Sequence, residues 1–198
     1  MRSVGHWAVG SVAAFLLSIG DLSVAIEVYP SQTQIQAALD RGAKAAAQHQ
    51  PPEKWYVRFG GNEDLDFGGF LVTKIGGLSV LATHMALRGH EPSATDIAQL
   101  VDATTMLVSA VIFGDSPAFA VESYMVLDQE GSTIKPVTVR VDGQATRTTA
   151  WPDSPKFMAK VVAAFKYADF DPNAHTIITV FPATGGELRF AVDFGDID

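Results

Sequence analysis

Residues 60–69 read GGNEDLDFGG and could bind a cation, because they hold four side chains with oxygen or amide groups between two pairs of glycines. Calcium takes oxygen ligands, and an EF-hand loop needs them at its positions 1, 3 and 5, with a glycine at position 6 and a glutamate at position 12. Asn62, Asp64 and Asp66 fall at positions 1, 3 and 5, but position 6 is a phenylalanine and position 12 a threonine. The segment is therefore not an EF-hand.

Two interpretations of this loop stay open at the level of sequence. Asn62, Asp64 and Asp66 could bind calcium weakly, since extracellular domains meet millimolar calcium and need only low affinity. The simpler interpretation is a solvated turn whose glycines allow positive φ angles. We favour the turn and expect no tightly bound metal.

Other motifs with established chemistry are missing from the sequence. The chain has no cysteine, which excludes disulfides, thiolate nucleophiles and cysteine-based metal sites. His84, His90 and His175 lack the i, i+4 spacing of a helical metal site. Residues 77–79 begin a nucleophile elbow, but a leucine stands in place of its second glycine. With no phosphate-binding loop either, we predict no catalytic, cofactor-binding or metal-binding residue and no cofactor.

Two alternatives rest on single residue types. A pair of carboxylates close in space could hydrolyse a glycosidic bond whatever their separation in the sequence. Asp169 and Asp171 are candidates, although their FDPN context is more typical of a turn. Trp151, beside a proline at a bend, could form the stacking platform of a carbohydrate-binding or small-ligand site. Trp55 alternates with apolar residues, and we expect it to be buried.

The overall charge limits the class of partner. The chain has 198 residues, a net charge of −8 and a pI near 5.0, with no run of Lys or Arg. A phosphate backbone would be repelled, so we predict no nucleic-acid partner. Anionic membrane surfaces are disfavoured for the same reason. The hydrophobic share of 47% is enough for a sizeable core.

Residues 1–25 have the three parts of a secretory signal peptide. Arg2 supplies the positive charge, residues 8–20 are uncharged and apolar, and small residues precede position 26. The apolar stretch is shorter than the ~20 residues that span a bilayer. We predict export to the periplasm or medium with cleavage after Ala25, and a mature domain of residues 26–198 without a membrane span. A retained anchor and a buried N-terminal helix are the alternatives.

Helical signals come before and inside the run of strands. Ser31 begins a capping box, and apolar residues then recur at helical spacing, which predicts a helix over residues 32–48. Two prolines end it, so residues 26–52 form an N-terminal helix and linker. Residues 77–102 show two helical stretches joined by a tight corner. The remainder of residues 53–198 has the alternation of strands.

The strand signals differ in strength. Period-two alternation predicts strands at residues 54–59 and 106–113, the second of them apolar on both faces. Residues 142–143 (Asp-Gly) and 185–186 (Gly-Gly) follow alternating stretches and predict two hairpins. Residues 154–168 fit both a helix and a strand, and we favour a strand from about residue 160.

The sum of these elements predicts an α+β, mainly β protein. It would be an antiparallel β-sandwich with an N-terminal helix and a helical pair inserted before the main run of strands. The Val-Arg-Val-Asp run at residues 139–142 and the ending Glu-Leu-Arg-Phe-Ala-Val-Asp-Phe at 187–194 resemble immunoglobulin-like β-sandwich domains. That resemblance implies a fold and carries no function.

The predicted function follows mostly from the motifs that are missing. We predict an exported, non-catalytic β-sandwich protein with an interaction or structural role outside the cytoplasm. Its partner would be another extracytoplasmic protein or a surface component, because unpaired strand edges and loops offer docking surfaces. A carboxylate-dependent hydrolase and a carbohydrate-binding or small-ligand-binding module are the alternatives.

Overall fold

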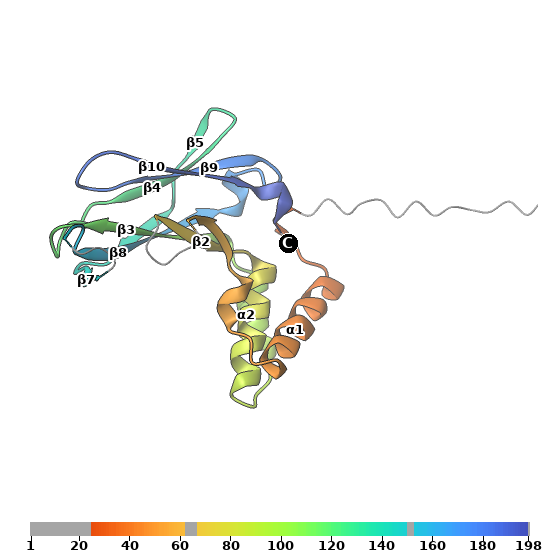
Figure 1. The fold of residues 1–198 in the computed structure, drawn as a ribbon. Coiled ribbons are helices and arrows are strands. Elements are labelled where there is room, and N and C mark those ends of the chain that lie inside the picture. Colours follow the sequence, from red (N-terminus) through yellow and green to blue (C-terminus); the bar gives the residue numbers. More distant parts are fainter. Residues whose placement is uncertain (1–24, 62–66, 150–152, 198) are drawn as a thin grey trace, which may run out of the picture.

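The structure is a computed structural model that describes residues 25–61, 67–149 and 153–197. Within these ranges the protein is α+β, with antiparallel strands in two sheets and three α-helices, as the sequence predicts (Figure 1). The helices are α1 (Gln32–Ala47), α2 (Lys74–Leu87) and α3 (Ala94–Val101). The strands are β1 (Val57–Gly60), β2 (Gly68–Val72), β3 (Thr105–Gly114), β4 (Tyr124–Gln129), β5 (Ser132–Ile134), β6 (Thr138–Val141), β7 (Thr146–Arg147), β8 (Phe157–Lys166), β9 (His175–Phe181) and β10 (Leu188–Asp193).

The two sheets pack face to face around one core. Sheet A has the order β1-β2-β3-β8-β6, with β7 also paired to β8, and sheet B has the order β10-β9-β4-β5. Side chains from both inner faces form one buried cluster that includes Val108, Val161, Leu127 and Ile178. At one side the edge strands β1 and β10 come close, and the rings of Phe59 and Phe190 lie 5.2 Å apart. The sheets do not close into a barrel, and an immunoglobulin-like arrangement stays a prediction.

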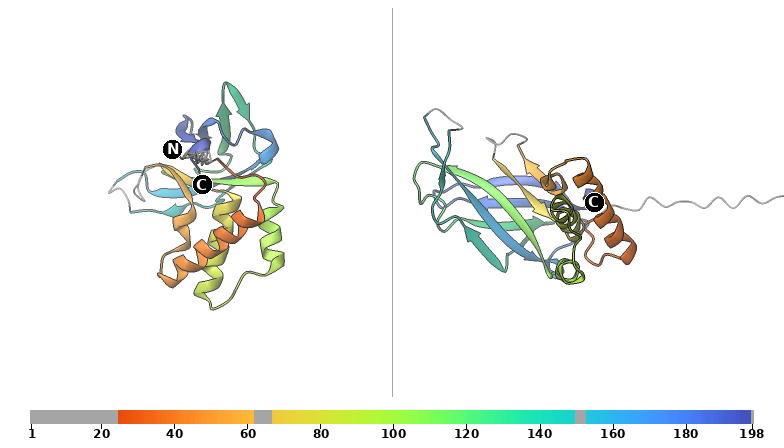
Figure 2. Two further views of the ribbon diagram at one scale, coloured as in Figure 1. Left: turned by 90° about the vertical axis from the view of Figure 1, so that its right-hand side faces the viewer. Right: turned by 90° about the horizontal axis from the view of Figure 1, so that it is seen from below.

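The helices form a second, smaller packing unit. The predicted capping box begins α1, where the Ser31 hydroxyl accepts the Gln34 backbone N–H and the Gln34 side chain accepts the Ser31 N–H. Helices α1 and α2 then pack against each other, and their apolar residues bury a separate cluster with partly buried residues of α3. Figure 2 shows the helices gathered at one end of sheet A, so that the strands of this sheet continue well beyond them.

Several predicted elements are confirmed. Helix α1 ends one residue before the predicted 32–48, and the helical pair occupies α2 and α3, starting three residues earlier than predicted. The ambiguous segment 154–168 is the long strand β8 followed by a short 3-10 helix. The hairpin at residues 185–186 joins β9 to β10, with both glycines at positive φ. In the part of the chain that the structure describes, no helix is long and apolar enough to cross a membrane.

The predicted hairpin at residues 142–143 is wrong. Strands β6 and β7 both pair with β8, so the chain continues along the same neighbour instead of reversing. The reason lies in Asp142, whose backbone N–H donates to the Lys160 carbonyl and whose carboxylate accepts the Lys160 backbone N–H. These bonds hold the Asp-Gly turn against β8. The turn therefore only interrupts the edge of sheet A between β6 and β7.

The predicted strand at residues 54–59 also begins too early. A short 3-10 helix, Pro52–Trp55, precedes β1. Trp55 is half-buried there, and its indole N–H donates to the Thr83 hydroxyl of α2 at 3.0 Å. This bond to the helical unit, which lies far away in the sequence, takes Trp55 out of the strand pattern.

Candidate functional site

The outer face of sheet A is the surface with the most unusual chemistry in the described structure. Alternation along the strands sends one set of side chains into the core and the other outward. The register aligns the outward set across the sheet, since Arg58, Phe70, Ser109, Val162 and Arg140 follow one another from β1 to β6. The outward side chains of the longer strands are Phe70 and Val72 on β2, Leu107, Ser109, Val111 and Phe113 on β3, and Met158, Lys160, Val162, Ala164 and Lys166 on β8.

The middle of this face is apolar apart from Ser109, whose buried hydroxyl has no hydrogen-bond partner among the described residues. Leu107, near the end of the face where the helices lie, is 51% exposed, and Val162 and Val111 further along the face are half-buried. The rings of Tyr56 and Phe70 stack with centroids 4.4 Å apart and planes 11° apart, which makes a flat aromatic surface next to them. A sheet that is apolar on both faces normally has a packing layer on each side. Here sheet B covers the inner face, whereas the helices reach only one end of the outer face (Figure 2).

The rim of this face is basic. Arg58, Arg140, Lys160 and Lys166 are outward and exposed, and no outward strand position of sheet A in the described residues is acidic. No ion pair joins these four cations to any residue that the structure describes. The carboxylate of Asp142, just beyond β6, accepts the backbone N–H of Lys160. A chain with a net charge of −8 thus presents a positive face.

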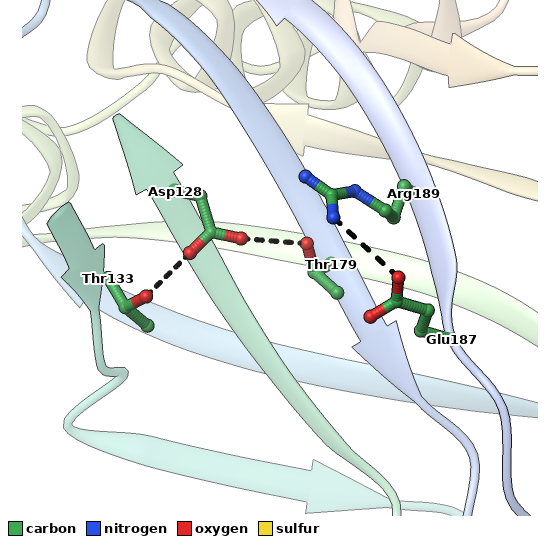
Figure 3. A network of polar contacts seen from close by, with 5 residues as sticks. All are labelled: Asp128, Thr133, Thr179, Glu187 and Arg189. Carbon is green, nitrogen blue, oxygen red and sulfur yellow. Dashed lines mark hydrogen bonds and ion pairs between the residues drawn. The ribbon is translucent and has the colours of Figure 1, made fainter. Parts of the chain in front are cut away.

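The outer face of sheet B provides a comparison within the same molecule. Its Asp128 carboxylate accepts hydrogen bonds from the hydroxyls of Thr133 at 2.7 Å and Thr179 at 2.9 Å (Figure 3). Arg189 has a neighbouring anion, Glu187, at 3.6 Å. Asp128 and Arg189 of sheet B thus have polar partners on their own face. The four cations of sheet A have no ion pair among the described residues, which makes the outer face of sheet A the stronger candidate for a docking surface.

A cavity of about 450 Å³ lies where the helices meet the sheets, and Lys74 lines it. The Lys74 side chain is 7% exposed, and its ammonium donates a hydrogen bond to the Val101 carbonyl. The same nitrogen lies 5.3 Å from the centroid of the Tyr167 ring and 5.9 Å from that of Tyr29. Desolvation lowers the pKa of Lys74, and the negative charge of Asp102 partly offsets this. We call this space the Lys74 cavity.

The residues singled out in the sequence lie apart from both features. Asn62, Asp64 and Asp66 fall outside the described residues, as does Trp151, so the predicted absence of a tight calcium site stays a prediction. Among the described residues, no three His, Asp or Glu side chains are placed to hold a metal ion. The three histidines considered as candidates are exposed and lie on different elements, His84 in α2, His90 after it and His175 in β9.

The carboxylate candidates do share a cavity. Asp169 and Asp171 line a space of about 430 Å³ together with Glu130. One oxygen of Asp171 accepts the backbone N–H of Asn173 at 2.8 Å, which is the turn-forming role expected from the sequence. His175 lines a different, open space of about 320 Å³ on the outer face of sheet B. No histidine is among the residues that line the space beside Asp169 and Asp171.

Neither the outer face of sheet A with its basic rim nor the Lys74 cavity was predicted from the sequence. The cations of the face lie between positions 58 and 166, and only the register of sheet A brings them together. Lys74 did leave a local signal, since it is the first residue of a helix that is otherwise apolar around it. A cation at a helix N-terminus opposes the helix dipole and is costly without a compensating role.

No protein-family model matches this chain, and no curated protein matches its sequence. The function must therefore be inferred from the chemistry of the outer face of sheet A and of the Lys74 cavity.

Proposed function

We propose that this protein is an exported, non-catalytic interaction protein that docks a partner protein on the outer face of sheet A. One observation carries the proposal: an apolar strip around Leu107 is bordered by Arg58, Arg140, Lys160 and Lys166, with no ion pair to any described residue. Exposed apolar surface bordered by polar groups is characteristic of interaction sites. Unpaired cations at the border are suited to guide and orient a partner.

The partner that fits this face has apolar side chains flanked by acidic ones. A second copy placed face to face would bring the four cations against their equivalents, which electrostatic repulsion disfavours. An amphipathic helix with an apolar stripe and acidic borders satisfies both requirements, because helices are the usual layer on an open sheet face. We therefore infer a partner protein that lays an acidic amphipathic segment across β2, β3 and β8.

Export is part of the same proposal. We infer that residues 1–25 direct the chain out of the cytoplasm and are removed after Ala25. The start of the core supports this boundary, since Ile26 is 2% exposed and its backbone N–H donates to the Pro172 carbonyl at 3.3 Å. Cleavage at this bond would leave every residue of the described core in the mature chain.

The export proposal predicts a defined N-terminus. Protein recovered from the periplasm or medium of cells that naturally make it should begin at Ile26, as judged by intact mass and N-terminal peptide mapping. A change of Ala25 to Arg places a large cation at the cleavage position and should leave uncleaved precursor. Full-length chain beginning at Met1, found in the cytoplasm, would contradict the proposal.

The docking proposal predicts position-specific cross-links. A photoreactive phenylalanine analogue at Leu107 should form a covalent adduct with the partner in the native cell envelope. The same analogue at Ala191, an exposed outward position of β10 in sheet B, should not. The purified partner should bind the Arg140→Glu/Lys160→Glu double variant at least about tenfold more weakly, because reversed charges repel an acidic border. Binding to the unchanged protein should weaken in 0.5 M salt.

A matched control uses lysines outside this face. Lys44 in α1 and Lys54 beside Trp55 are both exposed, and a Lys44→Glu/Lys54→Glu variant changes the net charge by the same amount. It should bind the partner as the unchanged protein does. Equal adducts from Leu107 and Ala191, an adduct with lipid, or equal weakening by the two double variants would each overturn the docking proposal.

A further inference from the structure

We propose that the Lys74 cavity is a binding site for a small carboxylate with an apolar body. The site is separate from the docking face and does not depend on it. Its volume of about 450 Å³ lies within the range of small-molecule sites. Valine, proline and alanine side chains form much of its wall, while Lys74, Asp102 and Thr104 contribute polar groups.

The charge of Lys74 is the first step of the argument. Buried charges in proteins are normally paired with an opposite charge, because desolvation is costly. Lys74 has no ion pair within the described residues, and Asp102 acts on it only through the longer-range attraction noted above. One of its three N–H groups donates to Val101, so two donors remain beside the cavity. An anion in the cavity would supply the missing partner.

The tyrosines limit the ligand further. Tyr167 is buried and packs against the Phe170 ring with centroids 5.8 Å apart, so its ring forms one wall of the cavity. Tyr29 is 87% exposed at the mouth of the cavity and can cover a flat ligand. Aromatic walls favour an apolar or aromatic body over a hydrated inorganic anion. The ligand class is therefore a small organic acid, with its carboxylate at Lys74 and its apolar part against the tyrosines.

Benzoate is a direct probe of this inference, and benzyl alcohol is its uncharged counterpart. Titration of the mature chain with benzoate, followed by NMR of the backbone amides, should give saturable shifts centred on Lys74, Asp102 and Tyr167. Benzyl alcohol and inorganic phosphate should bind at least tenfold more weakly. Lys74→Met, which keeps an unbranched side chain but removes the charge, should lower benzoate affinity at least tenfold, whereas Lys160→Met on sheet A should leave it unchanged.

A second variant keeps the test decisive if Lys74→Met does not fold. Asp102 is exposed and lines the cavity, where its charge repels an anionic ligand. Asp102→Asn should therefore raise benzoate affinity several-fold, with the fold checked by circular dichroism. The inference is overturned if benzoate gives no saturable shifts, if benzyl alcohol or phosphate binds as tightly, or if affinity is unaffected by Lys74→Met or falls in Asp102→Asn. None of these results involves the partner of sheet A.

Discussion

Replacing Gly42 with leucine should lower the free energy of unfolding by at least about 3 kcal/mol. Gly42 faces α2 at the helix crossing, where an added Cβ would overlap the Ser79 carbonyl oxygen and come within 2.7 Å of the Ala82 Cβ. The first of these neighbours is backbone, so the helices themselves must separate. Overpacking of this kind costs about 1–3 kcal/mol and more when the backbone must move.

The same crossing holds two buried hydroxyls that hydrogen-bond to α1, although each also has an acceptor four residues earlier in α2, Ile75 for Ser79 and Ser79 for Thr83. Ser79 donates to the Ala38 carbonyl at 3.0 Å, and Thr83 donates to the Gly42 carbonyl at 3.1 Å. Each such bond contributes about 1 kcal/mol, and separation of the helices would weaken both. Small residues on α1 thus allow a close approach that hydrogen bonds between the helices then stabilise.

Urea denaturation followed by circular dichroism measures this effect. Ala37→Leu is a matched control, because Ala37 is an exposed position in the middle of the same helix and should tolerate leucine with a change below about 0.5 kcal/mol. A Gly42→Leu protein as stable as the Ala37→Leu protein would show that α1 and α2 do not pack as described.

Local signals account for the elements that the sequence predicts correctly. The capping box at Ser31 and the glycine pair at residues 185–186 act within a few residues, so the sequence there contains the whole cause of the structure. Residues 142–143 carry an equally strong local signal, yet Asp142 bonds to Lys160 across the sheet. The predicted start of the strand at residue 54 is wrong for a similar reason, since the partner of Trp55, Thr83, lies in a helix that is distant in sequence.

The proposed docking face, the outer face of sheet A, could not be predicted from the sequence because it depends on register. In the sequence, Arg140 and Lys160 are polar positions in two alternating strands, as expected for any solvated face. The pairing of β6, β8 and β3 places them on the same face as the exposed Leu107 and leaves this face without acidic side chains in its described strands. A surface of this kind is a property of strand order, and strand order is set by contacts that are remote in sequence.

The Lys74 cavity and the docking face share a neighbouring element without sharing residues. Helix α2 begins at Lys74, directly after β2, whose Phe70 and Val72 belong to the outer face of sheet A. A ligand that draws Lys74 toward the cavity would act at the start of α2, at the end of the sheet where the helices lie. The two proposals have separate tests, so either can fail alone.

Above pH 10, the free energy of unfolding should fall because of Tyr167. Burial raises the pKa of its phenol to about 12, against 10.0 for an exposed tyrosine. Between these values the unfolded chain releases the proton while the folded protein keeps it, so the folded state binds more protons and stability falls as pH rises. The loss reaches about 2 kcal/mol by pH 11.5, from 1.36 kcal/mol per pKa unit.

Lys74 acts in the opposite direction in a lower window. Its pKa is lowered below 10.5 by desolvation, so the unfolded chain binds more protons there and stability rises as pH increases toward 10.5. With increasing pH, Lys74 thus causes a rise in the free energy of unfolding, and Tyr167 causes a fall at higher pH. Removing the Tyr167 phenol alone should abolish the fall in the free energy of unfolding above pH 10 and keep the rise that Lys74 produces.

Tyr167→Phe makes this separation measurable. The variant keeps the ring against Lys74 but removes the titrating hydroxyl. Its free energy of unfolding should not show the loss above pH 10, so its stability relative to the unchanged protein should rise by about 2 kcal/mol between pH 9.5 and 11.5 in urea denaturation. Tyr29→Phe removes an exposed hydroxyl at the mouth of the same cavity and should follow the unchanged protein throughout. Parallel curves for the unchanged protein and Tyr167→Phe would mean that the phenol of Tyr167 is solvated, and the buried wall of the cavity would then be open to water.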